Sequence, residues 1–175
     1  IDMLSLSAHK FHGPTGMGAL YCRTDMPVIP FIMGGAQEQG KRAGTENVPG
    51  IVGMAAALAS CCADMDVSHR KVSALRDRLI AAIQEIPGAR LIGSESNRLP
   101  GNVHFCFEGV GSTALLMALD MHGICASSGA ACAAHLSEPS HVLAALGLPE
   151  PLARGALRLS LSEHNTPEEI DYIIN

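Results

Sequence analysis

The chain has 175 residues, of which 47% are hydrophobic and 17% are charged, and its formal net charge is −5 at pH 7. These proportions are typical of a soluble globular protein, while the acidic balance and the lack of a long apolar run argue against nucleic acid and membrane as partners. None of the six cysteines forms a CxxC pair, and Cys61 and Cys62 are adjacent, so we expect free thiols and a reducing, cytoplasmic location.

The first 66 residues are interpreted as the end of a larger α/β domain. Residues 1–8 and 19–22 are predicted to form short strands, and a polar, Gly-rich loop covers residues 34–44. Asn47 and Pro49 then predict the start of a helix that continues to about residue 64. Because the chain begins at Ile1 within a strand-like stretch, we expect it to be a fragment of a longer protein.

Residues 67–175 are interpreted as a compact α+β domain. Val72, Leu75 and Leu79 recur at helical spacing and predict a long helix that ends before Pro87 and Gly88. Further strands are predicted at 91–92, 103–107, 124–126 and 156–161, and further helices at 112–121, 137–147 and from residue 167 onward. The mixture predicts a small sheet that is covered by helices.

Two details of this second part are specific enough to test. In the strand at 103–107, Val103 and Phe105 share one face, while His104 and Cys106 share the other. The segment Thr166-Pro167-Glu168-Glu169 predicts a capping box, followed by an apolar helix face with Ile170, Ile173 and Ile174.

Lys10 is the first candidate for chemistry. It follows an apolar strand in the segment Ser7-Ala8-His9-Lys10, where its amine can face a pocket. Lysine amines form Schiff bases with aldehydes such as pyridoxal phosphate, and a serine hydroxyl and an imidazole N–H suit a phosphate group. Taken alone, these four residues favour a surface turn with a solvated lysine, so the cofactor interpretation depends on context.

Cys132 and Arg158 are the other candidates. Cys132 ends the run Ser127-Ser128-Gly129-Ala130-Ala131-Cys132, whose small residues predict a bendable loop and a presentable thiol. Arg158 alternates with the leucines of its strand, faces away from their core and is suited to bind a carboxylate. An idle loop thiol and a surface arginine are the alternatives that the residues alone leave open.

Several segments of the chain, in order, resemble the cysteine desulfurases, which are pyridoxal-phosphate enzymes of the class V aminotransferase group. The similar segments are 7–21, 34–47, 127–132, 138–143, 157–160 and 165–171. The resemblance implies an α/β fold, the C-terminal part of a fold-type I pyridoxal-phosphate-dependent transferase. Residues 1–66 would end the large domain, and residues 67–175 would form the small domain, with the long cysteine loop of one subgroup.

The resemblance also implies the roles of individual residues and an activity. L-Cysteine would be converted to L-alanine, and its sulfur would pass through a protein persulfide to an iron–sulfur scaffold or sulfur-carrier protein. The implied roles are cofactor lysine for Lys10, phosphate ligands for Ser7 and His9, a phosphate ligand to the neighbouring subunit of a homodimer for Thr45, carboxylate clamp for Arg158, and persulfide carrier for Cys132.

The chain departs from the family pattern in three ways. Thr15 stands where the family usually has a second lysine, and Gln39 stands where it usually has an arginine, which bears on partner and subunit contacts. The family's aspartate at the pyridine nitrogen and its ring-stacking histidine have no counterpart here. We therefore expect little or no desulfurase activity from this fragment alone.

Parts of the sequence also fit other functions. Selenocysteine lyase and cysteine-sulfinate desulfinase share the lysine and the arginine, and a non-catalytic dimerisation or partner-docking fragment also fits. A nucleotide-binding phosphate loop at 35–41 fails because Arg42 replaces the required Ser or Thr. A metal site at Cys132, His135 and His141 matches no standard zinc spacing, so no metal is expected.

Overall fold

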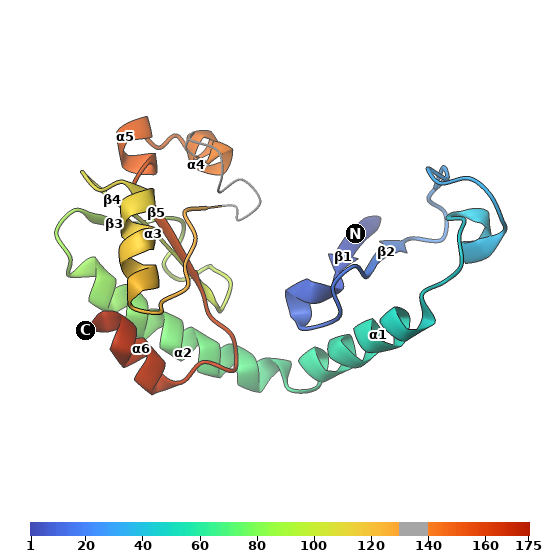
Figure 1. Ribbon diagram of the computed structural model, residues 1–175, viewed down its shortest axis with the longest axis horizontal. Helices are drawn as coiled ribbons and strands as arrows, with labels where there is room; N and C mark the ends of the chain where they lie inside the picture. Colours follow the sequence, from blue (N-terminus) through green and yellow to red (C-terminus); the bar gives the residue numbers. More distant parts are fainter. Residues whose placement is uncertain (130–139) are drawn as a thin grey trace. The chain divides into compact units, whose positions relative to one another are not determined.

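The computed structural model describes residues 1–129 and 140–175. The chain divides into two compact units, unit 1 (Ile1–Met65) and unit 2 (Asp66–Asn175) (Figure 1). The sequence places the domain boundary after residue 66. Each unit is described by itself below.

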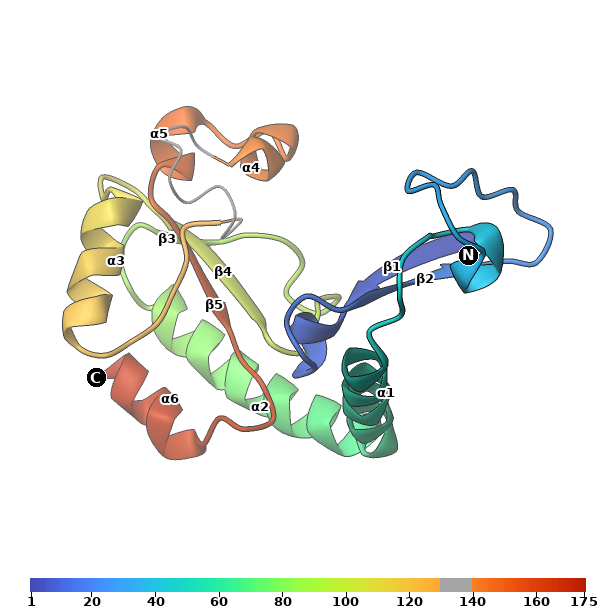
Figure 2. The ribbon, with the colours of Figure 1, turned by 45° about the vertical axis from the view of Figure 1, so that its right-hand side comes forward.

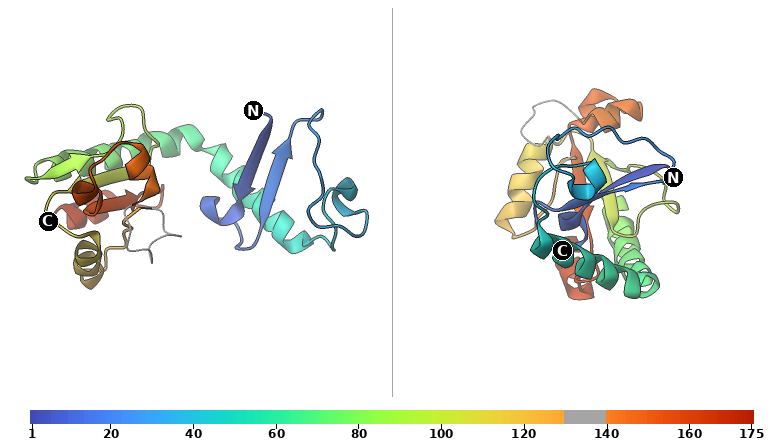
Figure 3. Two further views of the ribbon diagram at one scale, coloured as in Figure 1. Left: turned by 90° about the horizontal axis from the view of Figure 1, so that it is seen from above. Right: turned by 90° about the vertical axis from the view of Figure 1, so that its right-hand side faces the viewer.

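Unit 1 is built on a two-stranded antiparallel sheet. Strand β1 (Met3–Ser7) pairs with β2 (Gly18–Cys22) in a register that matches Met3 with Cys22 and Ser7 with Gly18. The 3₁₀ helix η1 (Ala8–Phe11) lies at one end of this pair (Figure 3), and a second, η2 (Gln37–Gly40), lies in the Gly-rich loop. The structure confirms both strands, whereas the sequence predicted neither 3₁₀ helix.

Helix α1 (Val48–Ala63) completes unit 1, and its first turn follows the prediction. Asn47 is the N-cap, its Oδ1 accepts a hydrogen bond from the Gly50 N–H at 3.2 Å, and Pro49 lies in the first turn. A side-chain acceptor at this position satisfies one of the N–H groups that an α-helix leaves unpaired.

Unit 2 contains a three-stranded antiparallel sheet with helices on both faces (Figure 2). The strand order is β3 (Ala89–Leu91), β4 (Asn102–Phe107), β5 (Ala156–Ser160). The helices are α2 (Met65–Gln84), α3 (Ser112–Met121), α4 (His141–Ala145), α5 (Glu150–Ala153) and α6 (Pro167–Ile174). Helices α2, α3 and α6 contribute to the core on one face, and α4 and α5 to the core on the other.

The two faces of β4 confirm the predicted alternation. Val103 and Phe105 belong to the larger core cluster, while Cys106 belongs to the smaller one. Leu79 and Ile170, from α2 and α6, are fully buried in the larger cluster. The sheet thus lies between two cores, and the strand register determines which side chains belong to each core.

The capping box of α6 is also confirmed. Thr166 Oγ1 accepts from the Glu169 N–H at 3.3 Å, and Glu169 Oε2 accepts from the Thr166 N–H at 3.1 Å. Ile170 and Ile173 face the core as expected, but Ile174 is 39% exposed. The predicted apolar face is therefore one residue shorter at the chain end.

Two predicted elements differ from the structure. The strand predicted at 124–126 is wrong, because the Ile124 N–H bonds to the Leu119 carbonyl and closes the C-terminal turn of α3, leaving only a single bridge at Ser127. The helix predicted from residue 137 begins at His141 within the described residues, with Ser140 as its N-cap, and residues 137–139 lie outside them.

Among the described residues, no single helix is both long and apolar enough to cross a membrane. Helices α1 and α2 meet the criterion of length and composition only when they are taken as a pair.

Candidate functional site

The candidate cofactor lysine lies on a short turn whose backbone is fixed at one buried residue. Ala8, the first residue of η1, is fully buried; its N–H donates to the Met17 carbonyl at 3.0 Å, and its carbonyl accepts from the Gly13 N–H at 2.9 Å. The polar side chains around it are exposed, namely Ser7, His9 and Lys10. A fixed backbone therefore carries an exposed hydroxyl, imidazole and amine within four residues, and their joint role at a cofactor stays a prediction.

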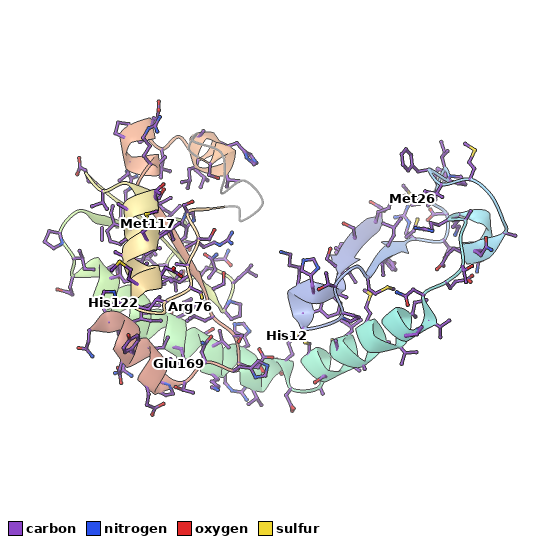
Figure 4. All side chains as sticks on the ribbon, viewed as in Figure 1. His12, Met26, Arg76, Met117, His122 and Glu169 are labelled. Atoms are coloured by element: carbon purple, nitrogen blue, oxygen red, sulfur yellow. The ribbon has the colours of Figure 1, made fainter. Side chains whose placement is uncertain are left out.

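The exit of this turn has a strict steric requirement. His12 has a φ of 65°, in the left-handed region, and follows η1 directly (Figure 4). A Cβ at Gly13 would lie 2.9 Å from the Ala8 Cβ and 3.0 Å from its carbonyl oxygen, which is closer than real side chains approach. Any larger residue at position 13 would displace the turn that carries Lys10.

Helix α1 lies directly behind the turn. A Cβ at Gly53 would lie 3.2 Å from Pro14, and the Cys61 thiol lies 3.5 Å from the Phe11 carbonyl, to which it donates. The small residues of α1 thus allow close approach, and the helix supports the lysine turn along its length.

Thr45 lies in a separate segment of unit 1. It is exposed and follows the Gly-rich loop, in which the Gln37 Oε1 accepts from the Gly44 N–H at 3.3 Å. Glu38 and Gln39 have φ angles of 50° and 57° in the intervening turn. Within the described part of unit 1, no hydrogen bond joins Thr45 to the lysine turn, so its predicted role in a neighbouring subunit stays a prediction.

Arg158 lies in the middle of β5, in a row of three polar residues that crosses the sheet of unit 2. It pairs with His104 of β4 on one side and, through an isolated bridge, with Ser127 on the other. The bridge is made by the Ser127 N–H to the Arg158 carbonyl at 3.0 Å and the Arg158 N–H to the Ser127 carbonyl at 2.6 Å. Directly paired residues project from the same face of a sheet, so all three side chains share one face.

The three polar residues of this row lie in a partly buried environment with a positive charge. Burial is the main cause that lowers the pKa of His104, and the positive charges of Arg158 and Arg98 lower it further. A neutral imidazole therefore lies beside a permanent cation. On the same face, burial raises the pKa of the Cys106 thiol, which makes that cysteine a poor nucleophile.

Sequence reasoning missed two buried or half-buried arginines near this sheet. Arg76 of α2 (Figure 4) is 6% exposed and binds the Asp77 carboxylate and the Leu99 carbonyl. Arg98 donates to the carbonyls of Ile92 and Asn102, at 2.7 and 3.1 Å. The helical spacing of Arg76 from the buried Val72 and Leu79 was the available signal for its burial. Both arginines fasten the loop before β4.

The predicted nucleophile Cys132 lies outside the described residues, and so does His135. The described cysteines of the chain, Cys22, Cys61, Cys62, Cys106 and Cys125, are all free thiols, in agreement with the prediction of no disulfide among them.

The side chains of the lysine turn fit pyridoxal phosphate as a donor set. An exposed lysine amine suits the aldehyde, and an exposed hydroxyl and imidazole beside it suit the phosphate. Arg158, on unit 2, has a buried Nε that no described residue pairs with, and its guanidinium suits a carboxylate.

Comparison with known proteins gives a consistent result. Residues 1–173 match the family described as aminotransferase class-V. A cysteine desulfurase IscS of Clostridium botulinum is 50% identical over 177 residues, which covers 99% of this chain and 45% of that protein. The cysteine desulfurase IscS of Methanosarcina thermophila is 48% identical over 174 residues, covering 99% and 43%.

Solved structures are similar as well. The NifS-like protein from Rickettsia africae superposes with a TM-score of 0.89 at 30% identity, covering 99% of this chain and 46% of that one. The structure described as SspA in complex with cysteine has a TM-score of 0.66 at 34% identity, covering 95% and 45%. The chain thus spans less than half the length of the relatives it matches.

Proposed function

This chain belongs to the aminotransferase class-V family, and we propose that the protein containing it is a cysteine desulfurase that depends on pyridoxal 5′-phosphate. The observation that carries the proposal is the 50% identity to a cysteine desulfurase over 99% of the chain, in a sequence that holds Lys10, Arg158 and Cys132 for the chemistry. The description of one similar structure as a complex with cysteine supports the choice of substrate.

We propose that unit 1 holds the cofactor. When bound, pyridoxal phosphate supplies an aldehyde that reacts with amines and a ring that withdraws electrons from the α-carbon of an amino acid. The Ser7 hydroxyl and the His9 imidazole N–H donate hydrogen bonds to the phosphate oxygens. The Lys10 amine is the attachment point and, once free, the base that moves the α-proton of the substrate.

Unit 2 is proposed to hold the substrate and its sulfur. Arg158 binds the carboxylate of L-cysteine, which orients the amino acid. The Cys132 thiolate forms a bond to the substrate sulfur while the bond between that sulfur and the β-carbon breaks. The electron pair of the broken bond stays on the carbon fragment, which takes up a proton and leaves as L-alanine, and Cys132 keeps the sulfur as a persulfide.

We also propose an oligomeric state and a sulfur acceptor for the enzyme. Thr45 donates to the phosphate in the neighbouring subunit, so the active protein is a homodimer. The persulfide sulfur passes to an iron–sulfur scaffold or a sulfur-carrier protein in the cytoplasm. The resemblance to the desulfurases supports these points, and so do the relatives, several of which are named cysteine desulfurases.

The complete protein, loaded with pyridoxal phosphate, tests the proposal directly. L-Cysteine should give L-alanine and sulfide in equal amounts when a thiol is present. Lys10→Ala should lower the rate by at least about a thousandfold, whereas Lys41→Ala, an exposed lysine of the same unit, should leave it within about twofold. L-Alanine formation that survives Lys10→Ala, or none from the wild type, would refute the proposal.

A further inference from the structure

The two neighbours His104 and Arg158 share an unusual feature of unit 2. The buried Nε2 of His104 and the buried Nε of Arg158 have no hydrogen-bond partner among the described residues. The residues are directly opposite each other in the β4–β5 register, so their Cβ atoms are separated by roughly 5 Å on one face. Buried polar atoms are nearly always paired, and two adjacent exceptions indicate a missing partner.

Arg158 differs in this respect from the other arginines near the sheet. Arg76 has an ion pair with Asp77, and the guanidinium of Arg98 donates hydrogen bonds to backbone carbonyls. Arg158 has neither an ion pair nor a side-chain hydrogen bond with the residues at 1–129 and 140–175. Among these residues, only the backbone of β5 fixes the position of Arg158. Its guanidinium N–H groups are therefore available to a ligand.

Among the described residues of β4 and β5, this face offers no carboxylate. The neighbours of His104 and Arg158 along β4 and β5 are uncharged, namely Asn102, Cys106, Ala156 and Ser160. A positive, partly dry patch without a carboxylate of its own is complementary to an anion that arrives with a ligand.

We infer that His104 is a second contact for the substrate carboxylate, its Nε2–H donating to the same carboxylate that Arg158 binds. In its neutral tautomer with the proton on Nε2, the imidazole is a donor, as Arg158 Nε–H is, and a single carboxylate satisfies both atoms. Arg158 supplies the charge, and His104 fixes the direction from which the carboxylate enters. This inference rests on the proposed function for the identity of the substrate.

Two substitutions at His104 separate this role from a structural one. Gln places an amide N–H near the Nε2 position, whereas the shorter Asn does not reach it. In the complete protein, His104→Asn should raise KM for L-cysteine about tenfold with kcat within about twofold, because a hydrogen bond to a charged group is lost in both ground and transition states. His104→Gln should keep KM within about twofold of the wild type.

The matched control is His69→Asn, an exposed histidine of α2, which should change neither constant. Equal effects of His104→Gln and His104→Asn, or a fall in kcat without a change in KM, would overturn the inference. Thermal unfolding of each variant shows whether it still folds. If His104→Asn does not fold, the KM of His104→Gln tests the inference.

A binding experiment keeps the inference separate from the desulfurase proposal. The ring signal of His104 in the NMR spectrum of the complete protein should shift on addition of L-alanine but not of ethylamine, which lacks the carboxylate. A shift with L-alanine in a protein that makes no alanine from cysteine would refute the proposed function and leave the carboxylate site standing. No shift with L-alanine, or an equal shift with ethylamine, would overturn the inference.

Discussion

The two units are stabilised by different means. Unit 2 has two core clusters on the faces of one sheet, with Phe105, Leu79 and Leu143 almost fully buried. In unit 1, Ala8 and Met54 are among the few buried apolar residues, while Phe31 is 96% exposed. Unit 2 therefore positions side chains through packing and register, whereas unit 1 positions the lysine turn through backbone hydrogen bonds and close contacts of small residues.

This difference matches the chemistry proposed for each unit. A residue such as Arg158 has its direction set by the strand pairing of a packed sheet. Lys10 has its place set by the backbone of Ala8 and Gly13, so its side chain keeps its freedom. An arginine that binds a carboxylate benefits from a rigid position. An amine that attaches, detaches and moves a proton benefits from a fixed backbone and a mobile side chain.

The largest expected effect comes from separating the units. A polypeptide of residues 66–175 should unfold in one cooperative transition, because its clusters are complete within it. A polypeptide of residues 1–65 should show no cooperative transition, since it buries little apolar surface. Circular dichroism during thermal unfolding measures both, and cooperative unfolding of residues 1–65 would remove the contrast.

The same substitution in both units sharpens the comparison. Phe105→Ala should lower the free energy of unfolding of the complete protein by about 3–5 kcal/mol, as large-to-small changes in a packed core do. Phe31→Ala, on an exposed ring, should change it by less than about 0.5 kcal/mol. Urea unfolding gives both values, and similar losses for the two variants would contradict the account.

Gly13→Ala tests whether the backbone fixes the lysine turn. The added methyl group would meet Ala8 at 2.9 Å, so we expect a loss of about 1–3 kcal/mol and weaker binding of pyridoxal phosphate. Gly111→Ala is the control, because a Cβ there has open space and φ is −82°. Unchanged cofactor affinity in Gly13→Ala would show that the close contact has no role.

The smallest expected effect concerns pH. Because burial and neighbouring arginines lower the pKa of His104 in the folded chain, the unfolded chain binds more protons as pH falls through the ordinary histidine value of 6.5. Stability should thus decline on the acid side of that value, and less so in His104→Asn. Unfolding free energies from pH 8 to pH 5, with His69→Asn as the control, check this sign; an identical decline in His104→Asn would contradict it.

Local patterns predicted most of the elements that position the site. The alternation of Val103 and Phe105 with His104, the N-cap Asn47 and the capping box at Thr166 are short-range signals, and the structure confirms each. The lysine turn was found from its motif, although its 3₁₀ geometry was not predicted.

Two of the features that the sequence did not reveal depend on contacts between distant residues, and a third depends on how a helix ends locally. The burial of Arg76 is compensated by the carbonyl of Leu99, 23 positions away. No strand forms at 124–126, because the Ile124 N–H donates to the Leu119 carbonyl at the end of α3. His104 Nε2 and Arg158 Nε, which no described residue pairs with, are brought side by side by the register of β4 and β5.

We propose that the protein carries sulfur on Cys132, and mass spectrometry of its cysteine peptides can detect that sulfur. The complete protein, loaded with pyridoxal phosphate, is incubated with L-cysteine without a reductant and digested, and the cysteine peptides are weighed by mass spectrometry. We expect that the Cys132 peptide gains one sulfur atom, that Cys132→Ala abolishes the gain, and that Cys125→Ala, at an exposed thiol, leaves it intact. L-Alanine formed at the wild-type rate by Cys132→Ala, with no added sulfur on the Cys132 peptide of the wild type, would contradict it.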